Sequence, residues 1–114
     1  MGLIFKEYLS GSSSDKILQC TCCKTHLSKD TDILSKAFHG EFGRAYLMNN
    51  VINYYEGPGQ DKQMATGLHH VHTIYCRTCS NVLGWKYEVA YEEDQKYKEG
   101  KFVLEVSHIS PGVA

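Results

Sequence analysis

The sequence lacks a large excess of charge of either sign, and it lacks long apolar runs. Its 13 acidic and 12 basic side chains give a formal net charge of −1 over 114 residues. This balance argues against a protein whose main role is to grip nucleic acid, because that role needs a basic field. Purely apolar runs reach only a few residues, far short of the roughly 20 that cross a bilayer, and the first residues lack the apolar segment of a secretory signal. We therefore expect a soluble, intracellular protein without a membrane or nucleic-acid partner.

Cysteine occurs at only five positions, and these follow a pattern. Two pairs share the spacing C-x-x-C, Cys20 with Cys23 and Cys76 with Cys79. A disulfide framework is the weaker interpretation, because the cytosol keeps thiols reduced. Two distant C-x-x-C elements are typical of two knuckles that close on one tetrahedral Zn²⁺, and four thiolates make such a site structural rather than catalytic. The alternatives are buried reduced cysteines that behave as small hydrophobes and a redox C-x-x-C, although neither motif lies in a βαβ pattern.

The distance between the knuckles indicates what the zinc does. The 52 residues between Cys23 and Cys76 are too many for a zinc finger or ribbon, so they form most of a domain whose ends the metal joins. Such a site offsets a large loop-closure cost and contributes on the order of 10–16 kcal/mol in small peptides. Cys22 is left over. Because adjacent side chains diverge, we interpret it as a non-ligand thiol, with exchange into the ligand set as the alternative.

Tyrosine, β-branched residues and glycine dominate, and helical periodicity is scarce, so the sequence predicts a mainly β fold. Strands are expected at residues 3–9, 33–38, 69–75, 81–90 and 102–106, and two more within 44–55. Asn49-Asn50 is predicted as the turn between those two, Gly57-Pro58-Gly59 as a loop, and residues 91–97 as a helical turn. The expected organisation is an N-terminal strand and flexible link at 1–15, a zinc-binding domain at 16–109, and a C-terminal tail at 110–114 that contains Pro111-Gly112.

Further motifs lie beside the knuckles: Gly43-Arg44-Ala45-Tyr46-Leu47, Asn53, Thr66-Gly67, Leu83-Gly84-Trp85-Lys86-Tyr87-Glu88 and Gln95-Lys96-Tyr97-Lys98-Glu99-Gly100-Lys101. With both C-x-x-C pairs, they make residues 20–107 resemble the Yippee family of small eukaryotic zinc-binding proteins. The resemblance implies a β-tent, two antiparallel sheets pinned at one end by a four-cysteine zinc site, as in the drug-binding domain of cereblon and in methionine-R-sulfoxide reductases. It also implies a nuclear or cytoplasmic protein linked to cell growth and division, and association with an E3 ubiquitin ligase of the CTLH/GID type.

An enzymatic role is not favoured. Sulfoxide reductases on this fold use a cysteine nucleophile on a late strand, whereas no cysteine follows Cys79 and Cys22 lies in the wrong segment. His70 and His72 share one face of a predicted strand and His69 lies on the other. Alternating histidines of this kind are more often surface or packing residues, with a base or a second metal site as the alternative. We expect no catalytic activity.

Trp85 and Tyr87 lie on one face of a predicted strand and match the cereblon segment that supplies two walls of an aromatic cage. Val71 and Ala65 stand near the positions where cereblon carries its other tryptophans, so the cage is incomplete. Trp85 and Tyr87 are interpreted as core residues, or as the walls of a cleft for a small ligand or a modified residue.

The remaining hypothesis is a binding module. Tyr91 and Tyr97 accompany the mixed-charge stretch at residues 92–101, which is either a solvated loop or a contact patch, since aromatic residues are enriched at interfaces. We expect a non-enzymatic, zinc-stabilised interaction module that contacts protein partners through Tyr91 and Tyr97. A ligand-binding cleft around Trp85 and Tyr87 is the alternative function.

Overall fold

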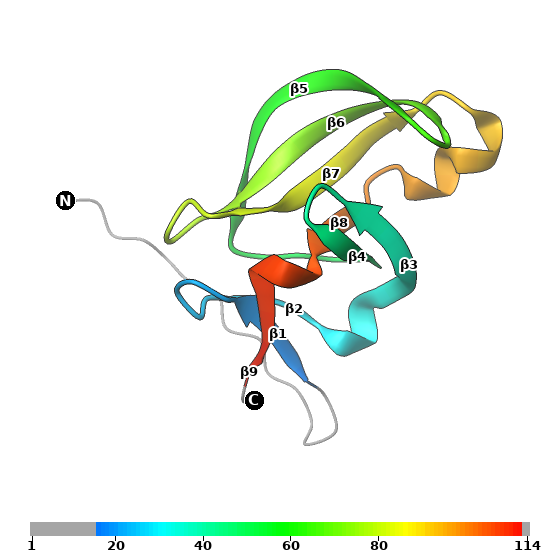
Figure 1. Cartoon of the computed structure of the whole chain (residues 1–114). Coiled ribbons are helices and arrows are strands. Elements are labelled where there is room, and N and C mark those ends of the chain that lie inside the picture. Colours follow the sequence, from blue (N-terminus) through cyan, green and yellow to red (C-terminus); the bar gives the residue numbers. More distant parts are fainter. Residues whose placement is uncertain (1–15, 113–114) are drawn as a thin grey trace.

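Two antiparallel sheets make up the domain (Figure 1). The computed structural model describes residues 16–112, and within that range nine strands are present. The small sheet has the order β2-β1-β9 and contains β1 (Ile17–Cys20), β2 (His26–Lys29) and β9 (Ile109–Gly112). The large sheet has the order β3-β4-β8-β7-β6-β5 and contains β3 (Ile33–Gly40), β4 (Gly43–Met48), β5 (Tyr54–Met64), β6 (Gly67–Cys76), β7 (Val82–Ala90) and β8 (Phe102–Glu105). Short 3₁₀ helices lie at η1 (Asp30–Asp32), η2 (Glu93–Lys98) and η3 (Val106–His108).

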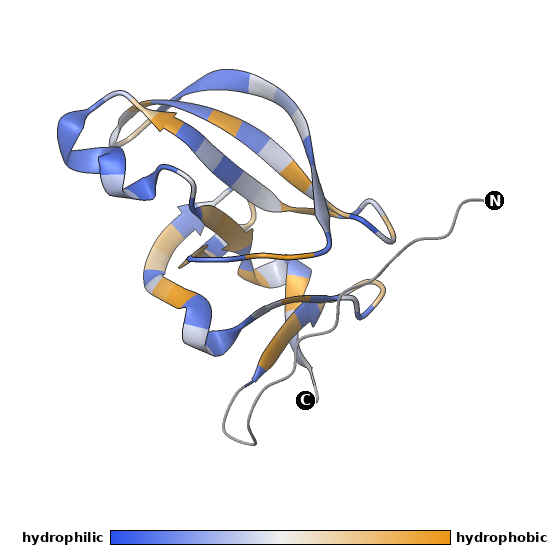
Figure 2. Cartoon of the chain, turned by 180° about the vertical axis from the view of Figure 1, so that it is seen from behind, coloured by the Kyte–Doolittle hydropathy of each residue, from blue (hydrophilic) through white to orange (hydrophobic). Residues whose placement is uncertain are grey.

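The large sheet buries apolar side chains on both of its faces. Successive residues of a strand point to opposite faces, so Leu47 of β4 and Val103 of β8 join one hydrophobic cluster while Met48 and Leu104 join the other. Figure 2 shows the resulting alternation of hydrophobic and hydrophilic residues along the strands. Both faces of the central strands are therefore covered by other side chains, which explains why β8 is buried at every position.

The two clusters serve different parts of the molecule. The larger one includes residues of both sheets and surrounds the cysteines; its buried members are Leu18, Cys20, Leu27, Met48, Val51, Ile74, Cys76, Leu83, Phe102, Leu104 and Ile109. The smaller one lies on the other face of the large sheet and contains Ala45, Leu47, Val71, Tyr87 and Val103, with Trp85 packed against it. The first cluster joins the sheets, and the second forms the floor beneath Trp85.

The mainly β fold of two antiparallel sheets is confirmed, but the predicted loop at Gly57-Pro58-Gly59 is wrong. These residues lie inside β5, where the register with β6 shifts between Glu56 and Gly59. A β-bulge of this kind adds a residue without ending the strand. Since β5 is the edge strand of the large sheet, Pro58 is tolerated there despite its missing N–H.

Two other predictions of connectivity are also wrong. Asn49-Asn50 does not join a hairpin, because β4 pairs with β3 and β8 whereas β5 pairs with β6. The expected tail is a strand as far as Gly112: β9 pairs with β1, Ile109 opposite Cys20 and Gly112 opposite Ile17. The predicted strand at residues 3–9 lies outside the described residues.

The strands expected at residues 33–38, 69–75, 81–90 and 102–106 agree with β3, β6, β7 and β8 to within a few residues. The helical turn expected at residues 91–97 is present as η2, whereas β1 and β2 were not predicted. Within residues 16–112, no helix combines the length and apolar character needed to cross a membrane.

Candidate metal centre and aromatic cleft

The two C-x-x-C pairs form knuckles with the same backbone hydrogen bonds. The first follows β1 and the second follows β6. In the first, the N–H of Lys24 donates to the carbonyl oxygen of Cys20 over 2.8 Å, and in the second the N–H of Ser80 donates to that of Cys76 over the same distance. Each strand is extended by a matching bond, from Cys20 to Thr25 and from Cys76 to Asn81. The repeated spacing in the sequence is thus a repeated local structure.

The knuckles bring four sulfur atoms together. The Sγ atoms of Cys20 and Cys79 lie 3.6 Å apart and those of Cys23 and Cys76 lie 3.5 Å apart, and all four sulfurs lie within 4.8 Å of one another. A tetrahedral zinc ion with Zn–S bonds of about 2.3 Å places its sulfurs roughly 3.8 Å apart. The donor set and its spacing therefore fit Zn²⁺. Cys22 is exposed and lies outside the cluster.

The protonation of the four thiols depends on their surroundings. Burial raises the pKa of Cys20 and of Cys76, and backbone N–H groups of each knuckle oppose this effect. Burial raises the pKa of Cys79 to about 11. Burial also raises the pKa of Cys23, but hydrogen bonds with Thr25, Cys76 and Cys79 together outweigh burial and lower this pKa to about 7. A metal ion favours the thiolate form of its ligands. A divalent cation bound by the four sulfurs would therefore offset the effect of burial and keep the thiols deprotonated.

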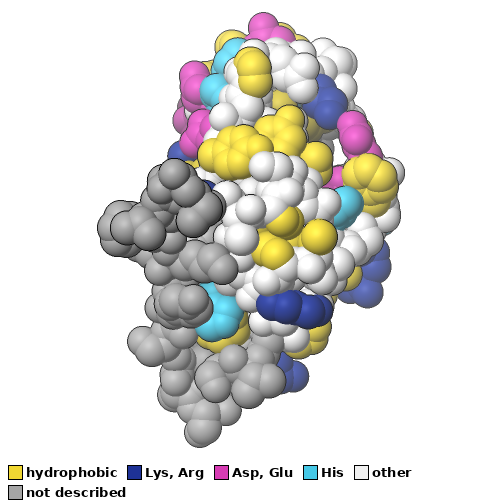
Figure 3. Space-filling view, turned by 90° about the vertical axis from the view of Figure 1, so that its left-hand side faces the viewer, with side chains coloured by type: hydrophobic (Ala, Val, Ile, Leu, Met, Phe, Trp, Pro, Cys, Tyr) yellow, Lys and Arg dark blue, Asp and Glu magenta, His cyan; other side chains and the backbone are white. Residues whose placement is uncertain are grey.

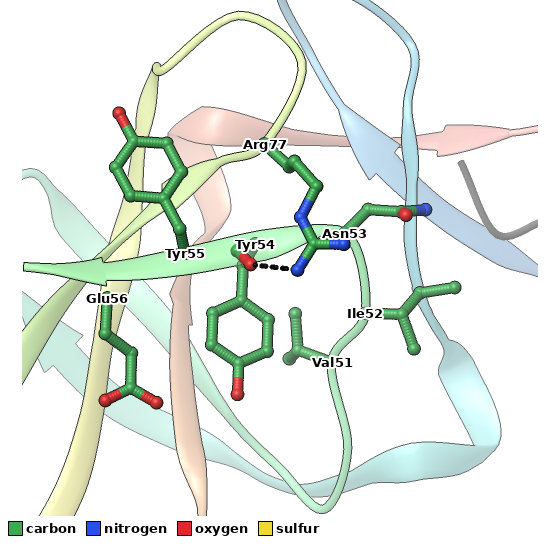
Figure 4. A pocket seen from close by; sticks show the side chains of 7 residues that line it. All are labelled: Val51, Ile52, Asn53, Tyr54, Tyr55, Glu56 and Arg77. Atoms are coloured by element: carbon green, nitrogen blue, oxygen red, sulfur yellow. Dashed lines mark hydrogen bonds between the residues drawn. The ribbon is translucent and has the colours of Figure 1, made fainter. Parts of the chain in front are cut away.

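The connection between β4 and β5 links the second knuckle to the small sheet. Asn53 Nδ2 donates to the carbonyl of His26 over 2.8 Å, and the carbonyl of Asn53 accepts from the N–H of Arg77 over 2.9 Å. A pocket of about 400 Å³ opens beside this connection (Figure 4), and Arg77 crosses it to donate to the carbonyl of Tyr54. The side chains drawn there come from this connection, the first residues of β5 and the second knuckle, so we assign this region a structural role.

The face of the large sheet that carries the smaller hydrophobic cluster also carries a cleft of about 510 Å³. We call it the aromatic cleft; it is lined by Phe38, Met64, Trp85, Tyr87, Tyr97 and Lys98, among others. The rings of Trp85 and Tyr87 meet edge to face with centroids 6.1 Å apart. Tyr87 is 1% exposed, and burial raises the pKa of its hydroxyl. The structure therefore gives Tyr87 the core position and Trp85 a place in both the core and the cleft wall.

Trp85 has an unused hydrogen-bond donor. The indole N–H opposes the effect of burial on the pKa of Tyr87, so it faces the side chain of that residue. Nε1 is buried and has no hydrogen-bond partner among the described residues. Because Nε1 is enclosed, a ligand in the cleft reaches it only if the neighbouring side chains move.

Lys98 is the cleft residue that the sequence analysis missed. Its Nζ lies 5.3 Å from the ring centre of Phe38, 5.4 Å from that of Tyr87 and 5.9 Å from that of Tyr97. It donates to Oγ1 of Thr66 over 3.1 Å, and the residue is only 3% exposed. Burial lowers the pKa of Lys98. A lysine within a charged stretch gives no sequence signal for this position, because the stretch has the composition of a solvated loop.

The two tyrosines predicted to contact partners are placed differently. Tyr97 is 58% exposed at the rim of the aromatic cleft. Tyr91 is 50% exposed and its hydroxyl donates to Oδ1 of Asp61 over 3.4 Å. The structure brings Tyr97 to Trp85 and Tyr87, whereas Tyr91 does not line that cleft.

A mainly β domain with two matched cysteine knuckles belongs to the class of zinc-binding β proteins. Comparison with known protein families identifies the family. The family model described as "Yippee zinc-binding/DNA-binding /Mis18, centromere assembly" matches residues 16–113, and the chain belongs to this family.

Similar proteins occur in plants and animals. A yippee-like protein of Arabidopsis thaliana is 53% identical over 110 residues, covering 96% of this chain and 88% of the relative. Yippee-like 3 of Danio rerio is 49% identical over 92% of this chain and 87% of the relative, and human yippee-like 4 is 46% identical over 92% and 81%. The crystal structure of the Mis18 "Yippee-like" domain superposes with a TM-score of 0.69 at 13% identity, over 89% of this chain and 98% of that one. At that identity, the similarity shows the fold alone.

Proposed function

We propose that this chain is a non-enzymatic interaction module, held together by one structural Zn²⁺ on Cys20, Cys23, Cys76 and Cys79, that binds a protein partner in the aromatic cleft. Four thiolate ligands leave the metal no open position for substrate. No cysteine follows Cys79 to act as a late-strand nucleophile. Both features favour binding over catalysis.

The observation that carries this proposal is a cleft that combines aromatic walls with a cation. The aromatic walls favour an apolar group, while the ammonium group of Lys98 favours an acceptor. Lys98 already places a cation against Phe38, Tyr87 and Tyr97, so a second cation, such as a methylated lysine, would be repelled. The cleft therefore suits a partner's apolar segment that carries a carbonyl or carboxylate oxygen.

The cellular setting is proposed from the family resemblance. We place the chain in the nucleus and cytoplasm, in a pathway of cell growth and division, as a subunit or regulator of an E3 ubiquitin ligase of the CTLH/GID type. The description of the matching family also includes DNA binding. The net charge of −1 disfavours nucleic acid as the partner, because phosphate contacts need clustered basic side chains.

The test compares partner sets by quantitative affinity purification. Tyr97→Ala and Lys98→Met change the cleft, whereas Leu34→Ala changes an exposed apolar residue on β3. We expect both cleft variants to lose one common set of partners, including ligase subunits, that Leu34→Ala and wild type retain. Zinc content and melting temperature verify that each variant is folded. Identical partner sets for all four proteins would contradict a partner-binding cleft, and retention that depends on added DNA would point to nucleic acid.

A small ligand is the second candidate for the same cleft, because its volume of about 510 Å³ lies in the range of small-molecule sites. Titration with imides, carboxylates and methylated amines, followed by Trp85 fluorescence, tests this alternative. Saturable quenching by imides or carboxylates, lost in Lys98→Met, would support it. A flat response to all three classes would remove it.

A further inference from the structure

Three potential metal ligands gather on two neighbouring strands of the large sheet. His70 and His72 lie on β6 and Glu88 lies on the neighbouring β7, and one ligand atom from each lies within 4.8 Å of the others. The predicted division of the histidines is confirmed: His69 is buried, while His70 and His72 pair on the other face with ring centroids 5.6 Å apart. In Figure 3, histidine and acidic side chains lie side by side at the top of the molecule.

Each histidine is held through its Nδ1 atom. Nδ1 of His70 lies 2.8 Å from Oδ1 of Asp61, and Nδ1 of His72 lies 2.9 Å from the carbonyl oxygen of Gly57. Both partners are acceptors, so each Nδ1 carries the hydrogen and each neutral ring keeps its lone pair on Nε2. A carboxylate or a backbone carbonyl behind Nδ1 is the usual outer support of a metal-binding histidine.

The contact between His72 and Glu88 requires a cation. Nε2 of His72 lies 2.5 Å from Oε1 of Glu88. With the hydrogen of the neutral ring on Nδ1, these two atoms are both acceptors and repel each other. Only a proton or a metal ion on Nε2 makes the contact favourable, and a metal ion would also engage His70.

The bulge in β5 is shaped around the histidines. A Cβ atom at Gly59 would lie 2.4 Å from Nε2 of His70 and 2.9 Å from Cε1 of His72. Glycine at this position therefore leaves open the space in front of the free nitrogen of His70. The same bulge supplies the Gly57 carbonyl, so one local feature both orients His72 and leaves room beside His70.

Nearby charges favour a divalent cation. Glu56 and Asp61 join Glu88 around the histidines, and the cation Lys86 already pairs with Glu56, with its Nζ 3.4 Å from Oε2. A metal with bonds of about 2.0–2.1 Å needs donor atoms roughly 3.3 Å apart, so Glu88 must retreat slightly. Its side chain is 57% exposed, and it can do so in solvent.

We infer that His70, His72 and Glu88 form a second, exchangeable site for a late first-row divalent metal ion such as Zn²⁺ or Ni²⁺. Imidazole and carboxylate donors suit these ions. Unlike the four-cysteine cluster, three ligands leave coordination positions open to water or to a side chain from another molecule. The site uses none of the groups in the proposed partner-binding cleft and stands independently of that function.

The experiment uses full-length protein already loaded with one equivalent of zinc. Equilibrium dialysis against Zn²⁺ or Ni²⁺ with elemental analysis, together with calorimetric titration, measures a second equivalent. We expect wild type to bind it and His70→Gln or His72→Gln to bind it at least about tenfold more weakly, while both variants keep the first zinc. His39→Gln, which removes an exposed histidine on β3, should bind the second ion like wild type.

Gly59→Ala provides an independent variant that keeps every ligand. Its added methyl group fills the space in front of Nε2 of His70, so we expect loss of the second equivalent with the first retained. Absence of a second equivalent in wild type would overturn the inference, and the contact would then be an ion pair of protonated His72 with Glu88. A second equivalent that survives both histidine substitutions would also overturn it.

Discussion

Lys24 and Ser80 adopt the same left-handed backbone conformation at equivalent places, with φ angles of 66° and 63°. Each directly follows the second cysteine of a knuckle, and each donates its N–H to the first cysteine's carbonyl. Residues with a Cβ atom rarely adopt this conformation, which costs roughly 1–2 kcal/mol. Its presence at both knuckles shows that the hydrogen-bonded C-x-x-C turn, rather than the preference of the residue itself, determines the backbone there.

Replacing Lys24 by glycine should therefore stabilise the protein. Glycine adopts a positive φ without steric cost, so we expect Lys24→Gly to raise the free energy of unfolding by up to about 1 kcal/mol, and Lys24→Val to lower it by about 1–2 kcal/mol. Chemical denaturation of the zinc-loaded proteins measures both. Lys29 is the control, because its φ of −118° is extended. There the order should reverse, with valine above glycine, and the same order at both positions would contradict the argument.

Removal of the metal should unfold the domain. The four-cysteine cluster lies between the small sheet and the end of β6, so a zinc ion there would join them, with a binding free energy on the order of the whole stability of a small domain. We expect an excess of a strong chelator at neutral pH to abolish the cooperative thermal transition, and zinc to restore it. Cys76→Ser should reproduce the loss, while Cys22→Ser at the exposed thiol should melt like wild type. An unchanged melting curve in chelator would contradict a zinc-held fold.

The sequence predicted the features that depend on local spacing. The knuckles were read from two C-x-x-C pairs, and the strands from alternation and β-branched content, since both are properties of neighbouring residues. It did not predict features that depend on distant partners. Gly57-Pro58-Gly59 has the composition of a loop, yet it lies in β5 because β6 pairs with it on both sides of the bulge.

The same limit applies to the cleft. Trp85 and Tyr87 were found because they share a strand face and match a known motif. Lys98 was missed, because its burial arises only when η2 folds against the rings of Phe38 and Tyr87. Pro111-Gly112 was predicted as a tail for a similar reason, since its pairing partner β1 lies more than 90 residues earlier in the chain.

Gly84→Ala should be among the most damaging single changes. Gly84 lies in β7 with a φ of +154°, and a Cβ atom there would lie 1.8 Å from the carbonyl oxygen of Val103 in β8. The obstacle is the backbone of a central strand, which cannot move aside, so we expect a loss of more than about 4 kcal/mol or failure to fold. The control is Gly100→Ala, whose added Cβ meets no atom within 4 Å among the described residues. Its φ of +78° limits the cost to about 1 kcal/mol. Equal effects on thermal stability would contradict this account.

Lys98 should make stability increase with pH on the alkaline side of neutrality. Burial lowers the pKa of Lys98 in the folded protein below the ordinary value of 10.5, so the unfolded chain binds the proton more tightly. The desolvation cost is present in full at neutral pH, and it is relieved as pH rises through the folded pKa towards 10.5. Lys98→Met removes this dependence. The free energy of unfolding of wild type relative to Lys98→Met should therefore rise between pH 7 and 10, as measured by urea denaturation of zinc-loaded protein. The raised pKa of Tyr87 acts in the opposite direction above pH 10, but Tyr87 is present in both proteins, so its contribution largely cancels in the difference.

Lys36→Met, which removes an exposed lysine on β3, provides the matched control and should show no such rise. A constant difference between wild type and Lys98→Met across this range would contradict a desolvated ammonium in the aromatic cleft.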